Sequence, residues 1–375
     1  MSVSITGIGI HPFGRFDDLT VTDLGVTAVR RALADAGNPE VDAAFCGTTY
    51  AGVAAGHKVL GAIGLTGMPI VDVEAGCASG GAALMLAATA VETGRASRAL
   101  VFGIEKMPRG MIRSTFFEPW REHAGLAATP AYFALRAQRL MRATGITKEH
   151  LARVVVKNRA HGLDNPDAMF RKETTVDDVL ASRVVCEPLH LHMLCSPNEG
   201  AAAVVVEPTT GNDTEVELAA VALRSHLPGG VLGEATPLAG LTDDTLTPPT
   251  TLAAQEAFAR AGMQPSDLDL VECQDTDAAR ELLSYVELGL CGSTDLVGWV
   301  DAGHTTRDGP LPVNVSGGLL SKGEPLGASA LGQVVELAAQ LRVDAGPRQV
   351  DGVRTALGHT VGRGANASVV ILRRR

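Results

Sequence analysis

The sequence lacks paired cysteines and long apolar runs, and these absences exclude several classes of protein. Its six cysteines include no CxxC pair, so neither a disulfide framework nor a zinc site is expected. No stretch of 18 or more residues is uninterruptedly apolar, and we therefore expect no membrane span. The first residues, MSVSITGIGIHPFGRF, lack the charged start and long apolar core of a signal peptide. Together these features favour a reducing, cytoplasmic location.

Positive charge is also scarce. Lys and Arg number 32 against 42 Asp and Glu, which gives a net charge of −10. Because nucleic-acid phosphates are bound by clustered Lys and Arg, we expect no nucleic-acid partner. The glycine-rich segment 316–323, SGGLLSKG, lacks the pattern of a phosphate-binding loop, so nucleotide hydrolysis is not supported. His190 and His192 have no third ligand near them in sequence, and we predict no metal site.

The sequence contains short apolar stretches that alternate with helical ones, a pattern typical of layered α/β folds. Strands are predicted at residues 2–10, 41–49, 69–76, 97–107, 200–208, 216–223, 268–273 and 367–374. Helices are predicted at residues 20–37, 80–94, 251–262, 278–289 and 327–342. The strand at 69–76 is expected to be buried because most of its residues are apolar.

Two breaks divide this alternation. Residues 109–186 are polar and rich in turns, which predicts an inserted loop domain with short helices. A polar turn after residue 208 predicts a boundary near residue 210. We therefore expect an N-terminal half, 1–210, that contains the loop domain, and a C-terminal half, 211–375. The two halves show a similar alternation of expected strands and helices, which indicates an internal duplication.

Residues 73–84, VEAGCASGGAAL, place Cys77 between an expected strand and an expected helix. A helix N-terminus offers unpaired N–H groups and partial positive charge, which favour a thiolate and can hold an oxyanion. Gly80 and Gly81 would let a ligand or another backbone come close. The alternative is that Cys77 is a small apolar residue packed under the helix.

Five segments carry a family resemblance, in the same order as in that family. They are EAGCASGG and its continuation (74–107), LARVVVKNRAHG through GAAAVVV (151–206), CQDTDAARELLSYVELGLCG (273–292), NVSGGLLSKGEPLGAS (314–329) and ALGHTVGRGANASVVIL (356–372). Together they resemble the thiolase superfamily, in its sterol-carrier-protein or lipid-transfer branch. The five segments cover most of the chain.

The resemblance implies a five-layer α/β/α/β/α thiolase fold built from two similar halves. It implies that Cys77 is the nucleophile that accepts an acyl group from a thioester, commonly of coenzyme A. The backbone N–H groups of Cys77 and of a residue near Gly364 would form the oxyanion hole. Coenzyme A thioesters or acyl-carrier proteins would then be the substrates, with no tightly bound cofactor. The segment around residues 70–80 would form the twofold interface of a homodimer.

Three catalytic positions depart from the family pattern. Glu324 stands in place of the histidine of the Gly-His-Pro block, and Gln274 and Thr276 replace the histidine and cysteine of the His-Asp-Cys-Phe block. An ionised Glu324 would disfavour a thiolate at Cys77, whereas a protonated Glu324 could donate a hydrogen bond to an oxyanion. Thr276 cannot act as a thiol acid or base. Carbanion formation, which needs a strong base, is therefore in doubt. Simple acyl transfer does not need so strong a base.

Four further groups are candidates with weaker arguments. His359 is either a surviving catalytic imidazole or a buttress of its loop. Gln274 could order a water in the oxyanion hole. Asp275 lies near the expected site, although it and Asp277 are also suited to cap the following helix. The basic residues that either contact a coenzyme A phosphate or form a solvated face are Lys157, Arg159, Arg171 and Lys172.

Three functions remain open on this basis. The first is an acyltransferase or condensing enzyme that forms an acyl-Cys77 intermediate, in lipid or specialised metabolism. The second is a retro-aldolase that acts on β-hydroxyacyl-coenzyme A with an OB-fold partner protein, for which Cys77 would be dispensable. The third is a thiolase-like subunit without catalytic activity.

Overall fold

The computed structural model describes residues 2–110, 120, 123, 129–228, 246–362 and 366–375. Within them the main element is one long sheet with the strand order β3-β2-β4-β7-β1-β8-β11-β10-β9, beside a small sheet of β5 and β6. The strands are β1 (Val3–Gly14), β2 (Ala43–Gly47), β3 (Ile70–Val73), β4 (Ala99–Lys106), β5 (Val184–Cys186), β6 (Leu189–His190), β7 (Glu199–Pro208), β8 (Val216–Ser225), β9 (Leu270–Glu272), β10 (Thr355–Gly362) and β11 (Asn366–Arg374). The helices are α1 (Val21–Asp35), α2 (Ala55–Gly61), α3 (Ser79–Glu92), α5 (Thr129–Thr144), α6 (Lys148–Gly162), α7 (Val176–Ala181), α8 (Pro249–Ala261), α9 (Ala278–Glu287), α10 (Leu296–Asp301), α11 (Gly318–Lys322) and α12 (Leu326–Arg342).

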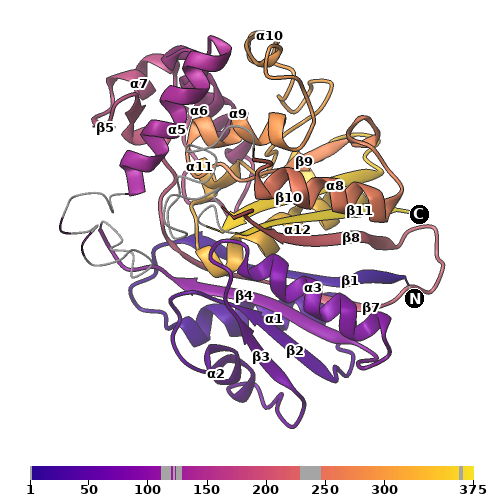
Figure 1. The fold of residues 1–375 in the computed structure, drawn as a ribbon. Helices are drawn as coiled ribbons and strands as arrows, with labels where there is room; N and C mark the ends of the chain where they lie inside the picture. The colour runs from indigo at the N-terminus through magenta and orange to yellow at the C-terminus, as the bar shows by residue number, and fades with distance from the viewer. Residues whose placement is uncertain (1, 111–119, 121–122, 124–128, 229–245, 363–365) are drawn as a thin grey trace.

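The sheet and helices form five layers (Figure 1). Helices α3 and α12 lie between the two halves of the sheet, where Leu84 and Leu331 share one core with Val204 and Val370 from opposite halves. Helices α1 and α2 cover the outer face of the N-terminal strands. Helix α8, with α9 beside it, covers the outer face of the C-terminal strands. This arrangement confirms the expected α/β/α/β/α layering.

The two halves of the sheet meet at a short antiparallel pairing of β1 with β8, at Ser4–Glu217 and Ile5–Val216. Each half then continues outward from this seam, to β3 on one side and to β9 on the other. The chain passes between the halves in the loop from β7 to β8. The boundary expected near residue 210 lies in this loop.

Helix α12 can lie close to the N-terminal strands because glycines face each other there. A Cβ on Gly103 of β4 would lie 2.2 Å from the carbonyl oxygen of Gly327 in the first turn of α12. A Cβ on Gly327 would lie 2.6 Å from the carbonyl oxygen of Gly47 in β2. A side chain at Gly103 or Gly327 would push α12 away from the sheet. The N-terminus of α12 is therefore fixed by backbone contact.

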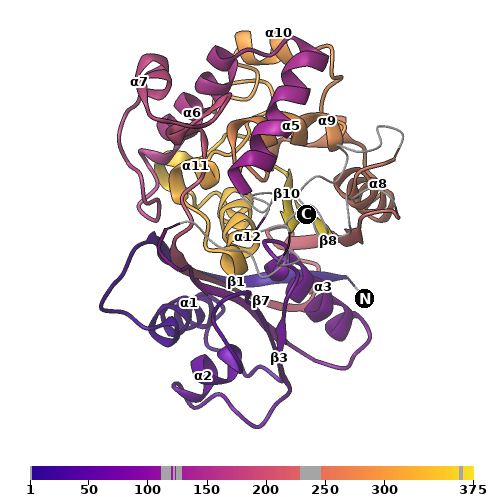
Figure 2. The same cartoon turned by 60° about the vertical axis from the view of Figure 1, so that its left-hand side comes forward.

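The described part of the inserted region, from residue 129 on, contains two long helices, α5 and α6, as well as the short helix α7. Figures 1 and 2 show α5, α6 and α7 gathered at the end of the molecule opposite α2. Helices α5 and α6 have 16 and 15 residues, because apolar side chains such as Leu140, Leu151 and Val155 are buried against α9 and the strands below. The polar face of each helix obscures this pattern in the sequence.

Strand β3 is not buried, which corrects the expectation for residues 69–76. It is the last strand at one edge of the sheet, and the side chains of Val71 and Asp72 are exposed. Its apolar residues therefore reflect its pairing with β2, not coverage on both faces.

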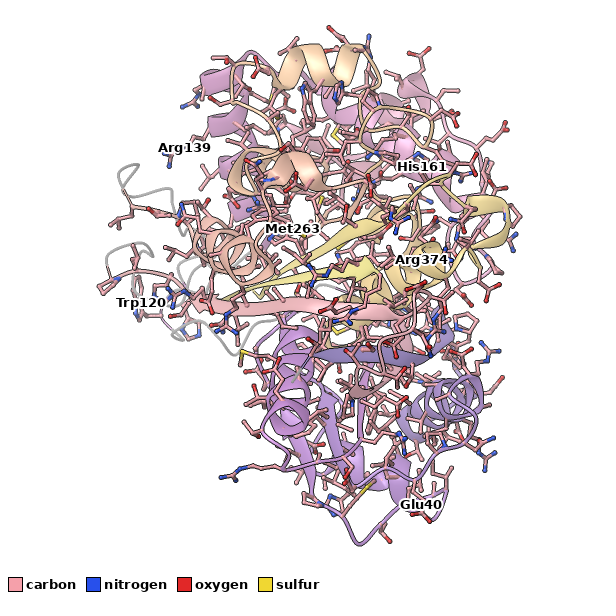
Figure 3. All side chains as sticks on the ribbon, turned by 90° about the vertical axis from the view of Figure 1, so that its right-hand side faces the viewer. Glu40, Trp120, Arg139, His161, Met263 and Arg374 are labelled. Carbon is pink, nitrogen blue, oxygen red and sulfur yellow. The ribbon has the colours of Figure 1, made fainter. Side chains whose placement is uncertain are left out.

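Helices in the described part of the chain are too short or too polar to cross a membrane. Figure 3 shows side chains filling the spaces between the layers, with His161 in the helical region and Glu40 at the opposite end of the molecule.

Replacing Gly103 with Ala tests the close approach of α12. We expect the free energy of unfolding to fall by about 1–3 kcal/mol, because the new methyl group overlaps the Gly327 carbonyl oxygen. Urea unfolding followed by circular dichroism measures this change. Gly61→Ala is the matched control, since a Cβ there meets no atom within 4 Å. Equal stability of both variants would contradict the packing argument.

Candidate active site

The N-termini of α3 and α12 meet inside the molecule, and each is preceded by a candidate catalytic residue. Cys77 lies two residues before the start of α3, and Glu324 lies two residues before the start of α12. The Cys77 side chain packs with Leu326, the first residue of α12, and with Met107. The structure therefore brings these two predicted residues into one site. Both helices direct the positive ends of their dipoles toward it, which favours negative charge there.

The turn that carries Cys77 is held by hydrogen bonds of its neighbours. Gly76 adopts a φ of 61°, a left-handed conformation that favours glycine. Ser79 Oγ donates to the Gly76 carbonyl oxygen at 2.6 Å and accepts from Ala75 N at 2.8 Å. Cys77 itself is buried, with 6% of its surface exposed. The nucleophile candidate thus lies in a fixed turn with little access to bulk water.

Glu324 is held by a segment that precedes β7. Its backbone N–H donates to the Ser196 carbonyl oxygen at 2.8 Å, and its carbonyl oxygen accepts from Asn198 N at 3.3 Å. Gly323 before it has a φ of 86°, and a Cβ there would lie 2.0 Å from Asn198 Nδ2. The two chain segments can pair side by side because residue 323 is a glycine.

Both carboxylate oxygens of Glu324 accept hydrogen bonds. Cys195 Sγ donates to Oε2 at 3.1 Å, and Gln274 Nε2 donates to Oε1 at 2.9 Å. The Gln274 side chain also accepts from Val361 N at 3.4 Å. Gln274 therefore orients Glu324. Burial, followed by the charge of Glu324, raises the pKa of the Cys195 thiol well above its usual value, so this thiol keeps its proton at neutral pH.

The other residues of the Gln274 segment have structural contacts. Asp275 accepts hydrogen bonds from the backbone N–H groups of Leu319 and Leu320 and so anchors α11. Asp277 caps α9 by accepting from Arg280 N at 2.9 Å, as expected. The Thr276 side chain is buried near the site, and its carbonyl oxygen accepts from Cys195 N at 2.9 Å.

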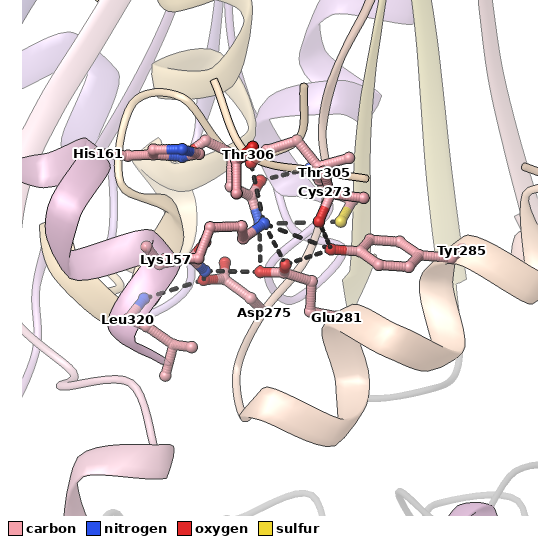
Figure 4. A network of polar contacts seen from close by, with 12 residues as sticks. Lys157, His161, Cys273, Asp275, Glu281, Tyr285, Thr305, Thr306 and Leu320 are labelled. Atoms are coloured by element: carbon pink, nitrogen blue, oxygen red, sulfur yellow. Dashed lines mark hydrogen bonds and ion pairs between the residues drawn. The ribbon is translucent and has the colours of Figure 1, made fainter. Parts of the chain in front are cut away.

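A buried polar network lies behind Asp275 (Figure 4). Asn158 Nδ2 donates to Asp275 Oδ2 at 2.8 Å and to Glu281 Oε2 at 2.6 Å. Lys157 Nζ donates to Glu281 Oε1 at 2.6 Å and to the Tyr285 hydroxyl at 3.3 Å. Burial, with the nearby Glu281 charge, raises the pKa of Asp275 well above its usual value. Lys157 is thus a buried ion-pair partner, which corrects both sequence interpretations of it.

His359 lies on β10, and its ring hydrogen-bonds to α8 rather than to Gln274 or Asp275. Nε2 shares a hydrogen bond of 3.1 Å with Thr250 Oγ1, and Nδ1 is buried without a hydrogen-bond partner. Burial lowers the pKa of His359 well below its usual value, so the imidazole is neutral. These contacts match the buttress interpretation, and they do not place the ring at Glu324. Gly364 lies outside the described residues.

A cavity of about 990 Å³ in the helical region extends to this site. Its lining contains basic residues, acidic residues, Leu194 and the site residue Cys195, and the charged residues include Arg159, Arg171, Lys172, Arg183, Glu173 and Asp178. The Arg159 guanidinium stacks on the Phe170 ring at 4.0 Å from the centroid, and burial lowers its pKa to about 10, so it stays charged at neutral pH. The guanidinium and ammonium groups of its lining are of the kind that binds phosphate oxygens.

Cys195 is the site residue that sequence reasoning missed. It lies 118 positions after Cys77 in the printed sequence, and no motif around it signals chemistry. Only the pairing of residues 195–198 with Glu324 brings its thiol to the carboxylate. Within the described residues, no cluster of three or more His, Cys, Asp or Glu side chains is arranged to hold a metal ion.

Comparison with known proteins gives consistent matches over the whole chain. A family model for the thiolase N-terminal domain matches residues 3–208, and one for the thiolase C-terminal domain-like region matches residues 235–374. Sterol carrier protein 2 of Gallus gallus is 34% identical over 98% of this chain and 71% of its own length. Acetyl-CoA acetyltransferase of Methanothermobacter thermautotrophicus is 35% identical over 99% of both chains. Among solved structures, an Ltp2-ChsH2(DUF35) aldolase is 25% identical with a TM-score of 0.88, covering 100% of this chain and 98% of that one.

Replacing Glu324 with Gln tests the electrostatic coupling of Glu324 to Cys195. The substitution removes a negative charge 3.1 Å from the sulfur. We expect alkylation of Cys195 by iodoacetamide at pH 8.5 to become about tenfold faster, because its thiolate form is less disfavoured. Peptide mass spectrometry measures the rate, and Cys291 in the same sample is the internal control. An unchanged rate at Cys195 would contradict the coupling.

Proposed function

This chain belongs to the thiolase family, and on that premise we propose that it is an acyltransferase that forms an acyl-Cys77 intermediate from a coenzyme A or acyl-carrier thioester. The observation that carries the proposal is the placement of Cys77 and Glu324 at the meeting N-termini of α3 and α12. A thiol and a carboxylate at two positive helix ends are suited to nucleophilic attack on a carbonyl carbon.

In the proposed reaction Cys77 Sγ attacks the thioester carbonyl carbon while the Glu324 carboxylate accepts the thiol proton. Glu324 would act as this base because its two oxygens already accept hydrogen bonds, which fits the ionised form. Gln274 orients the carboxylate and is not itself a proton carrier. Backbone N–H groups at Cys77 and near Gly364 would hold the oxyanion.

The reaction stops short of full thiolase chemistry. Thr276 offers a hydroxyl where the family pattern has a cysteine, and a hydroxyl does not ionise near neutral pH. The imidazole of His359 hydrogen-bonds to α8. Removal of a proton from an acetyl carbon needs a strong base that these residues do not supply. Transfer of an acyl group between two thiols, or from a thiol to another acceptor, needs only the Cys77–Glu324 pair.

The cavity supports a phosphorylated thioester as the substrate. Arg171, Lys172 and Arg183 line it together with Arg159, and guanidinium and ammonium groups bind phosphate oxygens. A pantetheine arm that starts among these residues would bring its thioester toward Cys195 and Glu324. Coenzyme A and a phosphopantetheine carrier both fit this description.

A homodimer through the β3 edge is part of the proposal. Strand β3 ends the sheet, and its Val71 side chain is 41% exposed. An unpaired strand edge with an apolar side chain favours pairing with a second copy.

A second candidate function is a retro-aldolase that acts on a β-hydroxyacyl thioester. The similarity to an Ltp2-ChsH2(DUF35) aldolase, with a TM-score of 0.88, favours it. That structure pairs Ltp2 with a second protein, and an OB-fold partner would have the same place here. A subunit without catalytic activity is the third possibility.

Incubation with acyl-coenzyme A tests the acyl-enzyme. We expect an intact-mass increase equal to one acyl group, located on Cys77 by peptide mapping, and none in Cys77→Ala. Glu324→Gln should slow the labelling by about 10²-fold or more, since a general base is lost. Retro-aldol cleavage that persists in Cys77→Ala would favour the lyase. Absence of both labelling and cleavage in the wild-type protein would leave the non-catalytic subunit as the function.

Charge reversal tests the phosphate end of the cavity. We expect Arg171→Glu to raise KM for acyl-coenzyme A by about tenfold, because a phosphate contact becomes repulsive. KM for the acyl-pantetheine thioester, which lacks the nucleotide, should not change. Arg153→Glu is the matched control, because Arg153 is exposed on α6 and does not line the cavity. An equal effect on both substrates would contradict the assignment.

A further inference from the structure

We propose that Cys195 is a second catalytic thiol of this site, which donates a proton to the leaving sulfur of the thioester and recovers that proton through Glu324. The inference rests on the proposed acyl-enzyme function. It assigns the acid of the reaction to a residue in a segment that the catalytic motifs of the sequence do not include.

The position of Cys195 is set by contacts on both of its sides. Its backbone N–H donates to the Thr276 carbonyl oxygen at 2.9 Å, and the next residue, Ser196, accepts from Glu324 N at 2.8 Å. The thiol is held 3.1 Å from Glu324 Oε2 by these two attachments. Cys195 is half-buried and is one of the residues that line the cavity, where a thioester would lie.

The surroundings of Cys195 raise the pKa of its thiol, so the thiol keeps its proton before the leaving sulfur departs. Burial, then the Glu324 charge, raises the pKa of the Cys195 thiol, and negative charge at Asp275 or Cys77 has the same effect. When Glu324 accepts the proton of Cys77, its negative charge disappears. One cause of the raised pKa is then removed, and Cys195 becomes a stronger acid at the step that requires an acid.

The proton movements balance. The Cys77 proton passes to the Glu324 carboxylate as the bond from Cys77 sulfur to the carbonyl carbon forms. The bond from that carbon to the leaving sulfur then breaks, and the leaving sulfur keeps the electron pair and takes the proton of Cys195. Protonated Glu324 returns a proton to the Cys195 thiolate. The net result is an acyl group on Cys77 and a proton moved from Cys77 to the released thiol.

The other polar groups near Glu324 are less suited to donate a proton to the leaving sulfur. Thr276 has a hydroxyl that does not ionise near neutral pH. Asp275 uses its oxygens to hold α11 and Asn158, and His359 shares its hydrogen bond with Thr250. Gln274 and Cys195 both donate hydrogen bonds to the Glu324 carboxylate. Of these two donors, the Gln274 amide does not titrate, whereas the Cys195 thiol has a transferable proton.

The test compares two leaving groups in single-turnover acylation of Cys77, followed by intact mass. One donor is acetyl-coenzyme A, whose thiol leaves poorly without a proton. The other is the aryl thioester S-phenyl thioacetate, whose thiolate is stable without one. We expect Cys195→Ala to slow acylation from acetyl-coenzyme A by about 10²-fold and from the aryl ester by less than about threefold.

Cys195→Ser separates proton donation from positioning. A serine hydroxyl can keep the hydrogen bond to Glu324 but is a much weaker acid than a thiol. We therefore expect this variant to acylate as slowly as Cys195→Ala with acetyl-coenzyme A. Cys291→Ala is the matched control, because it removes another half-buried thiol and should leave both rates unchanged.

Each other outcome overturns the inference. Equal loss with both donors in Cys195→Ala, or no loss with either, would show that Cys195 donates no proton while acyl-Cys77 formation stands. Recovery of the acetyl-coenzyme A rate in Cys195→Ser would show that the residue only positions Glu324. Failure of the wild-type protein to be labelled by either donor would overturn the acyl-enzyme function, and the proton donor with it.

Discussion

The close approach of two buried helices, α3 and α12, is the constraint on which the site depends. Both lie between the halves of the sheet, and both begin close to Cys77 and Glu324. A Cβ on Gly80 of α3 would lie 3.2 Å from the Gly327 carbonyl oxygen of α12, and a Cβ on Gly103 of β4 would lie 2.2 Å from the same oxygen. With a larger residue at this point, the helix ends would separate and the thiol would lose its position relative to the carboxylate.

If Glu324 stands where the family pattern has a histidine, as the motif order implies, the electrostatics around Cys77 differ from those of that pattern. A carboxylate near a thiol disfavours the thiolate, whereas an imidazolium favours it. The structure offsets part of this effect through the dipoles of α3 and α12 and through the donors on Glu324. Cys195 and Gln274 each donate a hydrogen bond to one oxygen of the buried Glu324 carboxyl group, so neither oxygen is left without a donor. In the proposed reaction, the two thiols and this carboxylate act as one coupled group.

The helical region and the core are joined by the buried network of Lys157, Asn158, Glu281 and Asp275. Isolated charges in such a place would be strongly destabilising, and here each has a charged or hydrogen-bonding partner. Asp275 also holds the first N–H groups of α11, the helix that leads to Glu324. These contacts thus fix the position of the Glu324 carboxylate relative to the cavity in the helical region.

The resemblance to the thiolase superfamily implied the layering. The sequence by itself determined most of the strands and helices and the placement of Cys77 before a helix. These features depend on local periodicity and on motifs that are contiguous in the chain. It also located Glu324, Gln274 and Asp275 near one another, because family order constrains them. Only the tertiary structure decided that Lys157 is buried and that His359 contacts α8. It also decided that residues 129–144 and 148–162 form long helices and that Cys195 lies against Glu324. Those outcomes depend on which distant segments pack together, and a polar or sulfur-containing side chain has no local pattern that reveals its partner.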